Sequence, residues 1–296
     1  MAIGDLITAA RYNNIQSVVA TVMGTGSGTD GYGQALASST VSAGSAVTAL
    51  DMQNLYDDMF AARVHQTGAA PTQIADMAAG NIIGEDTSDN PDGTAKGYTD
   101  FEGLLPTITG DKFLIHASQA SIEAAISSTR TTSWNGLITH EFTVTFASEN
   151  DRRYFFNAGG EIRFSAALTS AVGSKDTDWA TLLANMGTIK FNYTDTSATG
   201  TGTGSAIGNY DLTGTYQQIF IKTGSGVYAE NDYNINARSP TATTIQFRAQ
   251  FRDDDAGDPD VDENIDGDIT STIQQYRPSG LYVNVASPSY ANDVAL

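Results

Sequence analysis

After Trp134 the chain consists of short segments in which apolar and polar residues alternate, and this pattern restricts the fold more than any other feature. In HEFTVTFA, Phe142, Val144 and Phe146 alternate with polar neighbours, as expected of a strand with one buried face. About eight such segments follow one another between turn residues. We therefore predict a mainly β fold, with an antiparallel β-sandwich or jelly roll over residues 131–296. The segments are HEFTVTFA, EIRFSAALT, GTIKFNYT, QQIFIKT, DYNINAR, TTIQFRAQFRDD, GDITSTIQ and LYVNVAS.

The first 130 residues show helical spacing instead. A helix is predicted over residues 5–23, because four apolar residues recur at helical intervals: Ile15, Val18, Val19 and Val22. A second helix is predicted to begin with a capping box formed by Thr48 and Asp51 and to run through LDMQNLYDDMFAARVHQ. Residues 84–100 are predicted to be a polar linker. We expect residues 1–130 to form an α-helical attachment region and residues 131–296 the β domain.

Four shorter segments complete this prediction. Helices are expected over residues 119–127 and, inside the β region, over 177–186. The glycines after Asn157 predict a hairpin between two alternating segments within DRRYFFNAGGEIRFSAALT. Residues 200–208 are predicted to be an exposed hairpin tip, because they are rich in glycine, threonine and serine.

Composition narrows the possible functions. The chain has 34 acidic and 15 basic residues, a formal net charge of −19. Binding to nucleic acid or to an anionic membrane surface requires a surplus of Lys and Arg, so we expect neither partner. There is no cysteine, which excludes disulfides and thiolate metal ligands. No apolar run reaches the ~20 residues that span a bilayer, and the N-terminus does not resemble a signal peptide.

The sequence offers no strong catalytic or cofactor motif. Gly26, Gly28 and Gly31 form a GxGxxG string, but it follows a predicted helix instead of a strand, so we interpret it as a turn. The chain has three histidines, His65, His116 and His140, and their positions do not match a helical metal pair. His65 is predicted to complement the charge of its helix end or to make an interface hydrogen bond. We therefore predict no catalytic residue, no bound cofactor and no enzymatic activity.

The acidic run RDDDAGDPDVDENIDGD is the one candidate metal site. Its alternating oxygen-bearing side chains could gather around calcium: Asp258, Asp260, Asp262, Asn264 and Asp266. The twelfth position counted from Asp262 is Ile273, where a calcium loop of the EF-hand type has a bidentate glutamate. Two interpretations stay open, a calcium site and a solvated acidic loop between strands.

Several strings together resemble virion structural proteins of tailed bacteriophages, particularly T-even-like myoviruses of cyanobacteria. They are RYNNIQSVVATVMGTGSGTDGYGQ, HQTG, DRRYFFNAGGEIRFSAALT and VDENIDGDITSTIQQYRPSGLYVNVASPSY. The resemblance covers most of the chain and implies a component of a neck, tail, baseplate or fibre assembly, with no catalytic residues to carry over.

This resemblance leads to expectations about partners and location. We expect the chain to pack as a homo-oligomer, a trimer, and against other virion proteins. It would be made in the host cytoplasm without a signal peptide and reach the virion by assembly. The alternative is a fibre or capsid decoration module that binds a host-surface glycan through tyrosines of the C-terminal half. These are Tyr210, Tyr216, Tyr228, Tyr233, Tyr276, Tyr282 and Tyr290.

Overall fold

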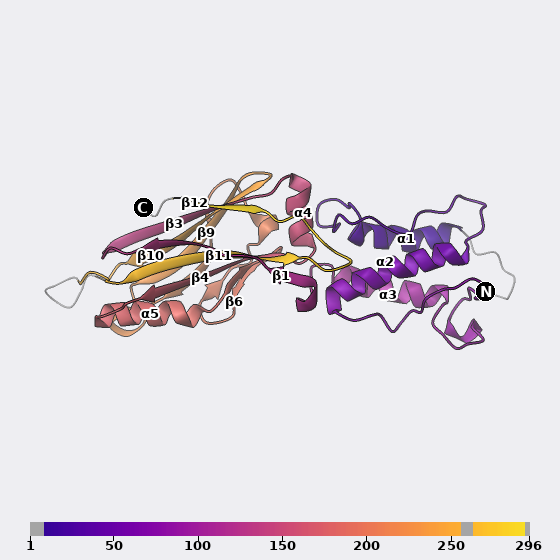
Figure 1. The fold of residues 1–296 in the computed structure, drawn as a ribbon, viewed down its shortest axis with the longest axis horizontal. Helices are drawn as coiled ribbons and strands as arrows, with labels where there is room; N and C mark the ends of the chain where they lie inside the picture. Colours follow the sequence, from indigo (N-terminus) through magenta and orange to yellow (C-terminus); the bar gives the residue numbers. More distant parts are fainter. Residues whose placement is uncertain (1–8, 256–262, 294–296) are drawn as a thin grey trace. The chain divides into compact units, whose positions relative to one another are not determined.

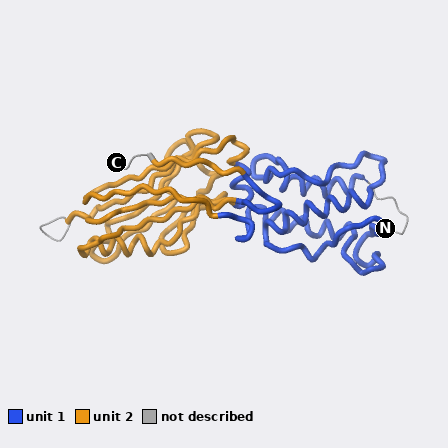
Figure 2. The backbone as a smooth tube through the Cα atoms, in the orientation of Figure 1, with its two compact units in different colours: residues 1–121, 153–159, 278–285 blue, residues 122–152, 160–277, 286–296 orange. Residues whose placement is uncertain are grey.

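The computed structural model describes residues 9–255 and 263–293. They form two compact units, and each unit is built from three separate stretches of the chain (Figure 2). Unit 1 combines the described part of Met1–Ser121 with Arg153–Gly159 and Pro278–Val285. Unit 2 combines Ile122–Arg152, Gly160–Arg277 and the described part of Ala286–Leu296. The sequence predicts a single division near residue 130 into two continuous regions, whereas the two units interleave along the chain.

Three helices form the body of unit 1: α1 (Ala9–Met23), α2 (Ala49–Thr67) and α3 (Tyr98–Gly110). They lie side by side (Figure 1). A short 3-10 turn, η1 (Thr87–Asp89), lies between α2 and α3, and a second, η2 (Ala117–Gln119), follows α3. The predicted apolar stripe of α1 is buried at Ile15, Val19 and Val22. The N-terminal helical region is thus confirmed.

The capping box predicted for α2 is present. The backbone N–H of Asp51 donates to Thr48 Oγ1 at 3.2 Å, and the N–H of Thr48 donates to Asp51 Oδ2 at 2.8 Å. At the other end Gly68 takes φ +75, and its N–H donates to the carbonyl of Val64 at 2.8 Å. Both ends of α2 therefore have satisfied backbone groups.

Helix α3 begins inside the segment predicted to be a linker. It buries Phe101, Leu104 and Ile108, and its first turn is closed by the N–H of Gly97, which donates to Asp100 Oδ2 at 2.9 Å. Arg11 of α1 holds this region by donating to Glu102 at 2.8 Å and to Glu85 at 2.7 Å. Only residues 98–100 of the predicted linker are helical, and residues 84–97 have no helix or strand apart from one 3-10 turn.

Unit 2 contains most of two antiparallel sheets, and the chain is mainly β as predicted. The first sheet has the order β1-β11-β4-β5-β6, with β2 also paired to β11. Its strands are β1 (Ala120–Ile122), β2 (Ile126–Arg130), β4 (Glu161–Thr169), β5 (Ile189–Phe191), β6 (Thr196–Ala198) and β11 (Asp268–Pro278). The second sheet has the order β12-β3-β10-β9-β8-β7. Its strands are β3 (Gly136–Thr145), β7 (Thr203–Gly204), β8 (Gln217–Thr223), β9 (Asp232–Thr241), β10 (Thr244–Asp253) and β12 (Ser289–Asp293).

Aromatic side chains from the two sheets meet in the core of unit 2. The ring of Phe247 on β10 lies 4.8 Å from that of Phe164 on β4 and 5.3 Å from that of Phe191 on β5. Helix α5 (Ser174–Met186) packs beside β4 (Figure 1) and contributes Trp179, whose ring lies 5.4 Å from that of Trp134. Short turns η3 (Asn209–Asp211) and η4 (Gly226–Tyr228) flank β8.

Three local predictions are wrong. The predicted hairpin after Asn157 is the end of helix α4 (Glu149–Asn157), whose first turn is capped by Ser148 Oγ accepting from the N–H of Asp151 at 3.0 Å. Residues 119–127 form β1 and the start of β2 because β11 offers them a pairing edge, with Ile126 opposite Ile273. The segment LYVNVAS is not a strand, although it buries Val283 and Val285. Residues 200–208 are largely exposed but include β7, which pairs with β8.

Gly159 and Arg152 show how the chain leaves α4 and how the helix is anchored. The φ of Gly159, just after the helix, is +80, which glycine adopts without strain. Arg152 is 7% exposed and donates to Asn209 Oδ1 at 2.8 Å and to Ser239 Oγ at 2.6 Å. Burial lowers the pKa of this guanidinium to about 10, so it remains a cation at neutral pH.

Candidate functional site

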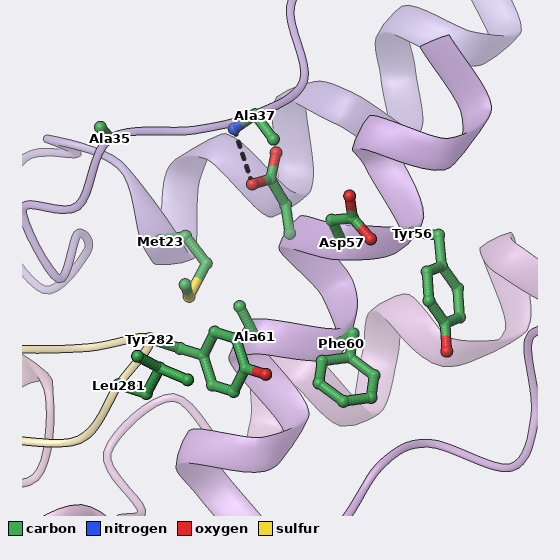
Figure 3. Close-up of a pocket in the computed structure, with 10 residues that line it drawn as sticks. Met23, Ala35, Ala37, Tyr56, Asp57, Phe60, Ala61, Leu281 and Tyr282 are labelled. Atoms are coloured by element: carbon green, nitrogen blue, oxygen red, sulfur yellow. Dashed lines mark hydrogen bonds between the residues drawn. The ribbon is translucent and has the colours of Figure 1, made fainter. Parts of the chain in front are cut away.

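A groove of about 480 Å³ opens on the surface of unit 1 (Figure 3). Its lining comes from the end of α1, the extended stretch after it, one face of α2 and the stretch 278–285, which is distant in sequence. We call it the aromatic groove, and it is lined by Met23, Ala35, Ala37, Tyr56, Asp57, Asp58, Phe60, Ala61, Leu281 and Tyr282.

Three aromatic rings form a row along this groove. Tyr56 and Phe60 are one helical turn apart on α2, with ring centroids 5.9 Å apart. Tyr282 meets Phe60 edge-on, at 5.6 Å and an interplanar angle of 80°. Such tilted and edge-on arrangements are favourable for aromatic pairs. Desolvation, helped by the carboxylates of Asp76 and Asp57, raises the pKa of Tyr56, so its phenol stays a hydrogen-bond donor at neutral pH.

Leu281 makes the rim of the aromatic groove unusually apolar. Its side chain is 86% exposed, beside a row of half-buried aromatic residues. A single exposed leucine is ordinary on a protein surface, but a leucine that continues an aromatic groove enlarges one apolar patch. Covering this patch with another apolar surface would release water and stabilise the contact.

The two carboxylates of the aromatic groove have different roles. Asp58 is buried and accepts from the N–H of Ala37 at 2.9 Å, the N–H of Ser38 at 2.8 Å and Ser38 Oγ at 2.5 Å. It therefore fixes the position of Ala37 and Ser38 against α2. Asp57 is exposed and accepts from Gln53 Nε2 at 2.8 Å. Eight of the ten lining residues are apolar or aromatic, and the two carboxylates are the charged groups among them.

The glycine-rich string near Gly28 is a turn, as predicted. Gly26, Gly28 and Gly31 have φ values of +43, +57 and +95. The carbonyls of the turn point at donors: Arg153 donates to the carbonyl of Thr25 at 2.8 Å, and Asn157 donates to that of Gly31 at 3.3 Å. A phosphate cradle needs backbone N–H groups directed at the ligand, whereas this turn directs carbonyls at side chains of α4.

The three histidines are divided between the units, with His65 and His116 in unit 1 and His140 in unit 2. His65 is fully buried, and its Nε2 donates to the carbonyl of Ala158 at 2.9 Å. Burial lowers the pKa of His65 to about 4, so the prediction of a charge complementing the end of α2 is wrong. His116 lies near it, since the N–H of His116 donates to the carbonyl of His65 at 2.9 Å, but the side chain of His116 is exposed. His140 is buried in unit 2.

The structure describes two of the five candidate calcium ligands. Asp258, Asp260 and Asp262 lie outside the described residues. Asn264 and Asp266 are exposed, and the N–H of Asp266 donates to Asp176 Oδ1 at 2.9 Å. Within residues 9–255 and 263–293, no three acidic or histidine side chains are placed to hold a metal ion together.

The tyrosines of the C-terminal half are dispersed. Tyr233 is fully buried and belongs to the core of unit 2, while Tyr282 lies in the aromatic groove of unit 1. Tyr276 lies under the guanidinium of Arg163 at 3.8 Å. Tyr210 is the most exposed of the set at 65%, and its ring stacks on that of Tyr193 with centroids 5.8 Å apart and an angle of 26°. Tyr233 is therefore part of the core, whereas Tyr210 is available for contact with a ligand.

The aromatic groove is not predicted by the sequence. Tyr56 and Phe60, four residues apart on a helix predicted correctly, were the available signal, because such a pair shares one face. Tyr282 was assigned to a strand, and nothing in the sequence places it against α2.

Comparison with models of known protein families, with curated proteins and with solved structures found no match to this chain. Among the residues that the structure describes, no helix combines the length and the apolar character needed to cross a membrane.

Proposed function

We propose that this chain is a non-catalytic structural component of a tailed bacteriophage particle, in its neck, tail, baseplate or fibre assembly. It acts by packing against copies of itself and against neighbouring virion proteins. The observation that carries the proposal is the aromatic groove, in which Leu281 is 86% exposed beside a row of three rings. The resemblance of several strings to virion structural proteins supports the same conclusion.

For the β region we propose the two-layer sandwich, of jelly-roll type, that the alternating segments predict. Contacts of Phe247 with Phe164 and Phe191, which come from the other sheet, support two layers that share one core. Such a body is stable without cofactors and presents strand ends and loops for assembly.

The occupant that we propose for the aromatic groove is an apolar segment of a second copy of this chain. Contacts between identical chains account for most soluble oligomers, and a trimer is the form we expect. The groove is largely apolar, which suits a lasting contact, and the exposed carboxylate of Asp57 at its edge suits a polar rim.

The test compares Leu281→Asp with Val172→Asp. Both wild-type side chains are highly exposed, at 86% and 87%, so neither change disturbs a core, but only Leu281 lines the groove. We expect L281D to shift the purified protein from oligomer to monomer in sedimentation analysis and to lower its incorporation into particles. V172D should behave as the wild type. A wild-type protein that is monomeric and absent from intact particles would end the proposal, and capture of a different virion protein by the groove would reassign the partner.

A second function, binding of a host-surface glycan, is favoured by one observation. Tyr210 is 65% exposed and is backed by the stacked ring of Tyr193, so it offers a flat aromatic platform of the kind that sugars contact. In this case Tyr210→Ala would abolish binding to host envelope glycans in a pull-down, while L281D would leave that binding intact. Glycan binding that survives Y210A, or no binding by the wild type, would remove this alternative.

A further inference from the structure

A lysine and an aspartate meet inside unit 2. Lys175 Nζ lies 2.8 Å from Asp253 Oδ2, and the two side chains are 2% and 0% exposed. Lysine is almost never fully buried unless it is paired, because removing an ammonium from water is costly, and a buried ion pair recovers little of that cost. A lysine buried to this extent therefore needs an explanation that goes beyond a surface ion pair.

The two residues come from elements that are distant in sequence. Lys175 lies in the first turn of α5, and Asp253 is the last residue of β10. The side chains next to them on the same faces are aromatic: Trp179 follows Lys175 by one helical turn, and Phe251 precedes Asp253 by two residues. The rings of Trp179 and Phe251 are 6.1 Å apart, and both residues are buried. The pair therefore borders an apolar, water-poor environment.

Low polarity weakens the preference for the charged forms of both groups. Transfer of one proton from the ammonium to the carboxylate gives a neutral amine and a neutral carboxylic acid, which such an environment tolerates better than separate charges. These two forms are the reactants of amide formation.

Two carbonyl groups also hold Lys175 Nζ in place. They are the carbonyl of Glu263 at 3.1 Å and the carbonyl of Asp255 at 3.4 Å. A neutral amine has two N–H donors and one lone pair. The lone pair is the group that attacks a carboxyl carbon, and the carboxyl group of Asp253 lies within 2.8 Å of Nζ.

We propose that Lys175 and Asp253 condense to an intramolecular amide, a covalent crosslink formed once by the folded chain. Nζ attacks Cγ of the protonated Asp253, the proton leaves the nitrogen, and the Cγ–OH bond breaks. The products are one amide and one water molecule, with no change in oxidation state. Holding the two reactants in contact supplies effective molarities of about 10⁵ M or more, which free amines and acids in water lack.

Asp255 is placed to move the proton. Its Oδ2 lies 3.9 Å from Lys175 Nζ, and its side chain is 16% exposed. As a carboxylate it can accept the proton from the attacking nitrogen and return it to the departing hydroxyl.

The crosslink would join two elements of the β body. It would connect α5, which packs beside β4 of the first sheet, to β10, an interior strand of the second sheet. Closing this long loop of chain restricts the unfolded state, as a disulfide does, in a protein that has no cysteine.

The experiment is intact-mass spectrometry of the purified full chain, followed by tryptic mapping. We expect a mass lower than that of the sequence by one water molecule, no tryptic cleavage after Lys175, and a branched peptide that joins Lys175 to Asp253. Lys175→Arg keeps the positive charge but cannot condense, so it should show the full sequence mass. Lys222→Arg, on β8, is the matched control and should still lose water.

Two further variants separate the roles. Asp253→Asn should form the same amide with loss of ammonia instead of water, and Asp255→Ala should slow the mass change in freshly folded protein. A wild-type chain with the full sequence mass would overturn the proposal. So would a water loss that maps to an aspartyl-glycine site, such as Asp92–Gly93, since that residue pair can lose water by local cyclisation.

Discussion

His140 shows how much a single buried side chain can couple this fold to pH. It lies on β3 inside unit 2, fully buried, with its ring 5.4 Å from that of Phe251. Neither ring nitrogen has a hydrogen-bond partner among the described residues. Burial, with a smaller contribution from Arg130, lowers the pKa of His140 from 6.5 to about 4. The folded chain therefore holds this histidine neutral where the unfolded chain would protonate it.

We predict that acid destabilises unit 2 through His140. Between pH 6.5 and about 4 the unfolded state binds the extra proton, so the free energy of unfolding falls as the pH falls through this range. The full loss is about 3 kcal/mol and is complete below the lower value. Both tryptophans of the chain, Trp134 and Trp179, lie in unit 2. Urea unfolding followed by tryptophan fluorescence at several pH values measures the effect.

The matched variants are His140→Leu and His116→Gln. H140L removes the titrating group and should flatten this part of the pH dependence, whereas H116Q changes an exposed side chain and should leave it unchanged. An H140L protein that loses as much stability in acid as the wild type would show that other groups are responsible.

At the scale of elements, two glycines of unit 1 differ in whether their position tolerates a side chain. Gly159 follows α4 with φ +80, and a Cβ there would lie 2.8 Å from Ile115 Cγ2 and 2.9 Å from the carbonyl oxygen of Phe113. Gly103 lies inside α3, where a Cβ would meet no atom within 4 Å. Position 159 therefore requires glycine. At position 103 glycine has no steric role and only lowers the helix propensity of α3.

We predict that Gly159→Ala and Gly103→Ala shift stability in opposite directions. G159A should lower the free energy of unfolding by about 2–4 kcal/mol, because it combines a strained φ with a close contact. G103A should raise it by about 1 kcal/mol through helix propensity. Thermal unfolding followed by far-ultraviolet circular dichroism compares them. Equal effects from both variants would contradict this account of the packing around Gly159.

An element can be predicted from the sequence when its own residues carry the helical or alternating pattern, and not when pairing with a distant element determines its structure. Strand β4 has the predicted bounds, Glu161–Thr169, because Ile162, Phe164 and Leu168 alternate with more exposed neighbours. Strand β8 also has its predicted bounds, Gln217–Thr223, although Ile219 and Phe220 are buried in succession. Helix α4 was missed although Ser148 and Asp151 have the spacing of a capping pair, because the adjacent Phe155 and Phe156 suggested a strand. The β1 and β2 segment resembled a helix in composition, and its pairing with β11 is a long-range choice.

The candidate sites were harder to predict than the elements. The aromatic groove requires Tyr282 to lie against Phe60, a contact between residues more than two hundred positions apart in the numbering. The pairing of Lys175 with Asp253 is also a contact between residues that are far apart in the sequence. Sequence periodicity reports which face of an element is buried, but it carries no information about which distant element covers that face.

At the scale of the whole molecule, the division into units predicts how fragments behave. Residues 153–159 and 278–285 complete unit 1, and they include Asn157, which donates to the carbonyl of Gly31, and Tyr282 of the aromatic groove. A fragment of residues 1–121 lacks these contacts, and the Nε2 of its buried His65 loses the carbonyl of Ala158. A buried donor without a partner costs about 1–3 kcal/mol.

We predict that the fragment 1–121 unfolds without a cooperative transition. The matched control carries the same residues followed by 153–159 and 278–285 through flexible glycine-serine linkers, and it should recover cooperative unfolding in calorimetry. A fragment 1–121 that unfolds as cooperatively as this control would show that the two short stretches are dispensable.

The interleaved course of the chain also bears on how such a gene can change by recombination. A single crossover could replace residues 1–121 with those of a homologous gene. The original Arg153, Asn157 and Tyr282 would then have to pack against residues with a different sequence. Hybrids made by one exchange should therefore be poorly viable unless the parents agree at those positions. Unit 1 is encoded by three separate stretches of the gene. We therefore expect these stretches to be inherited together with the parts of unit 2 that lie between them.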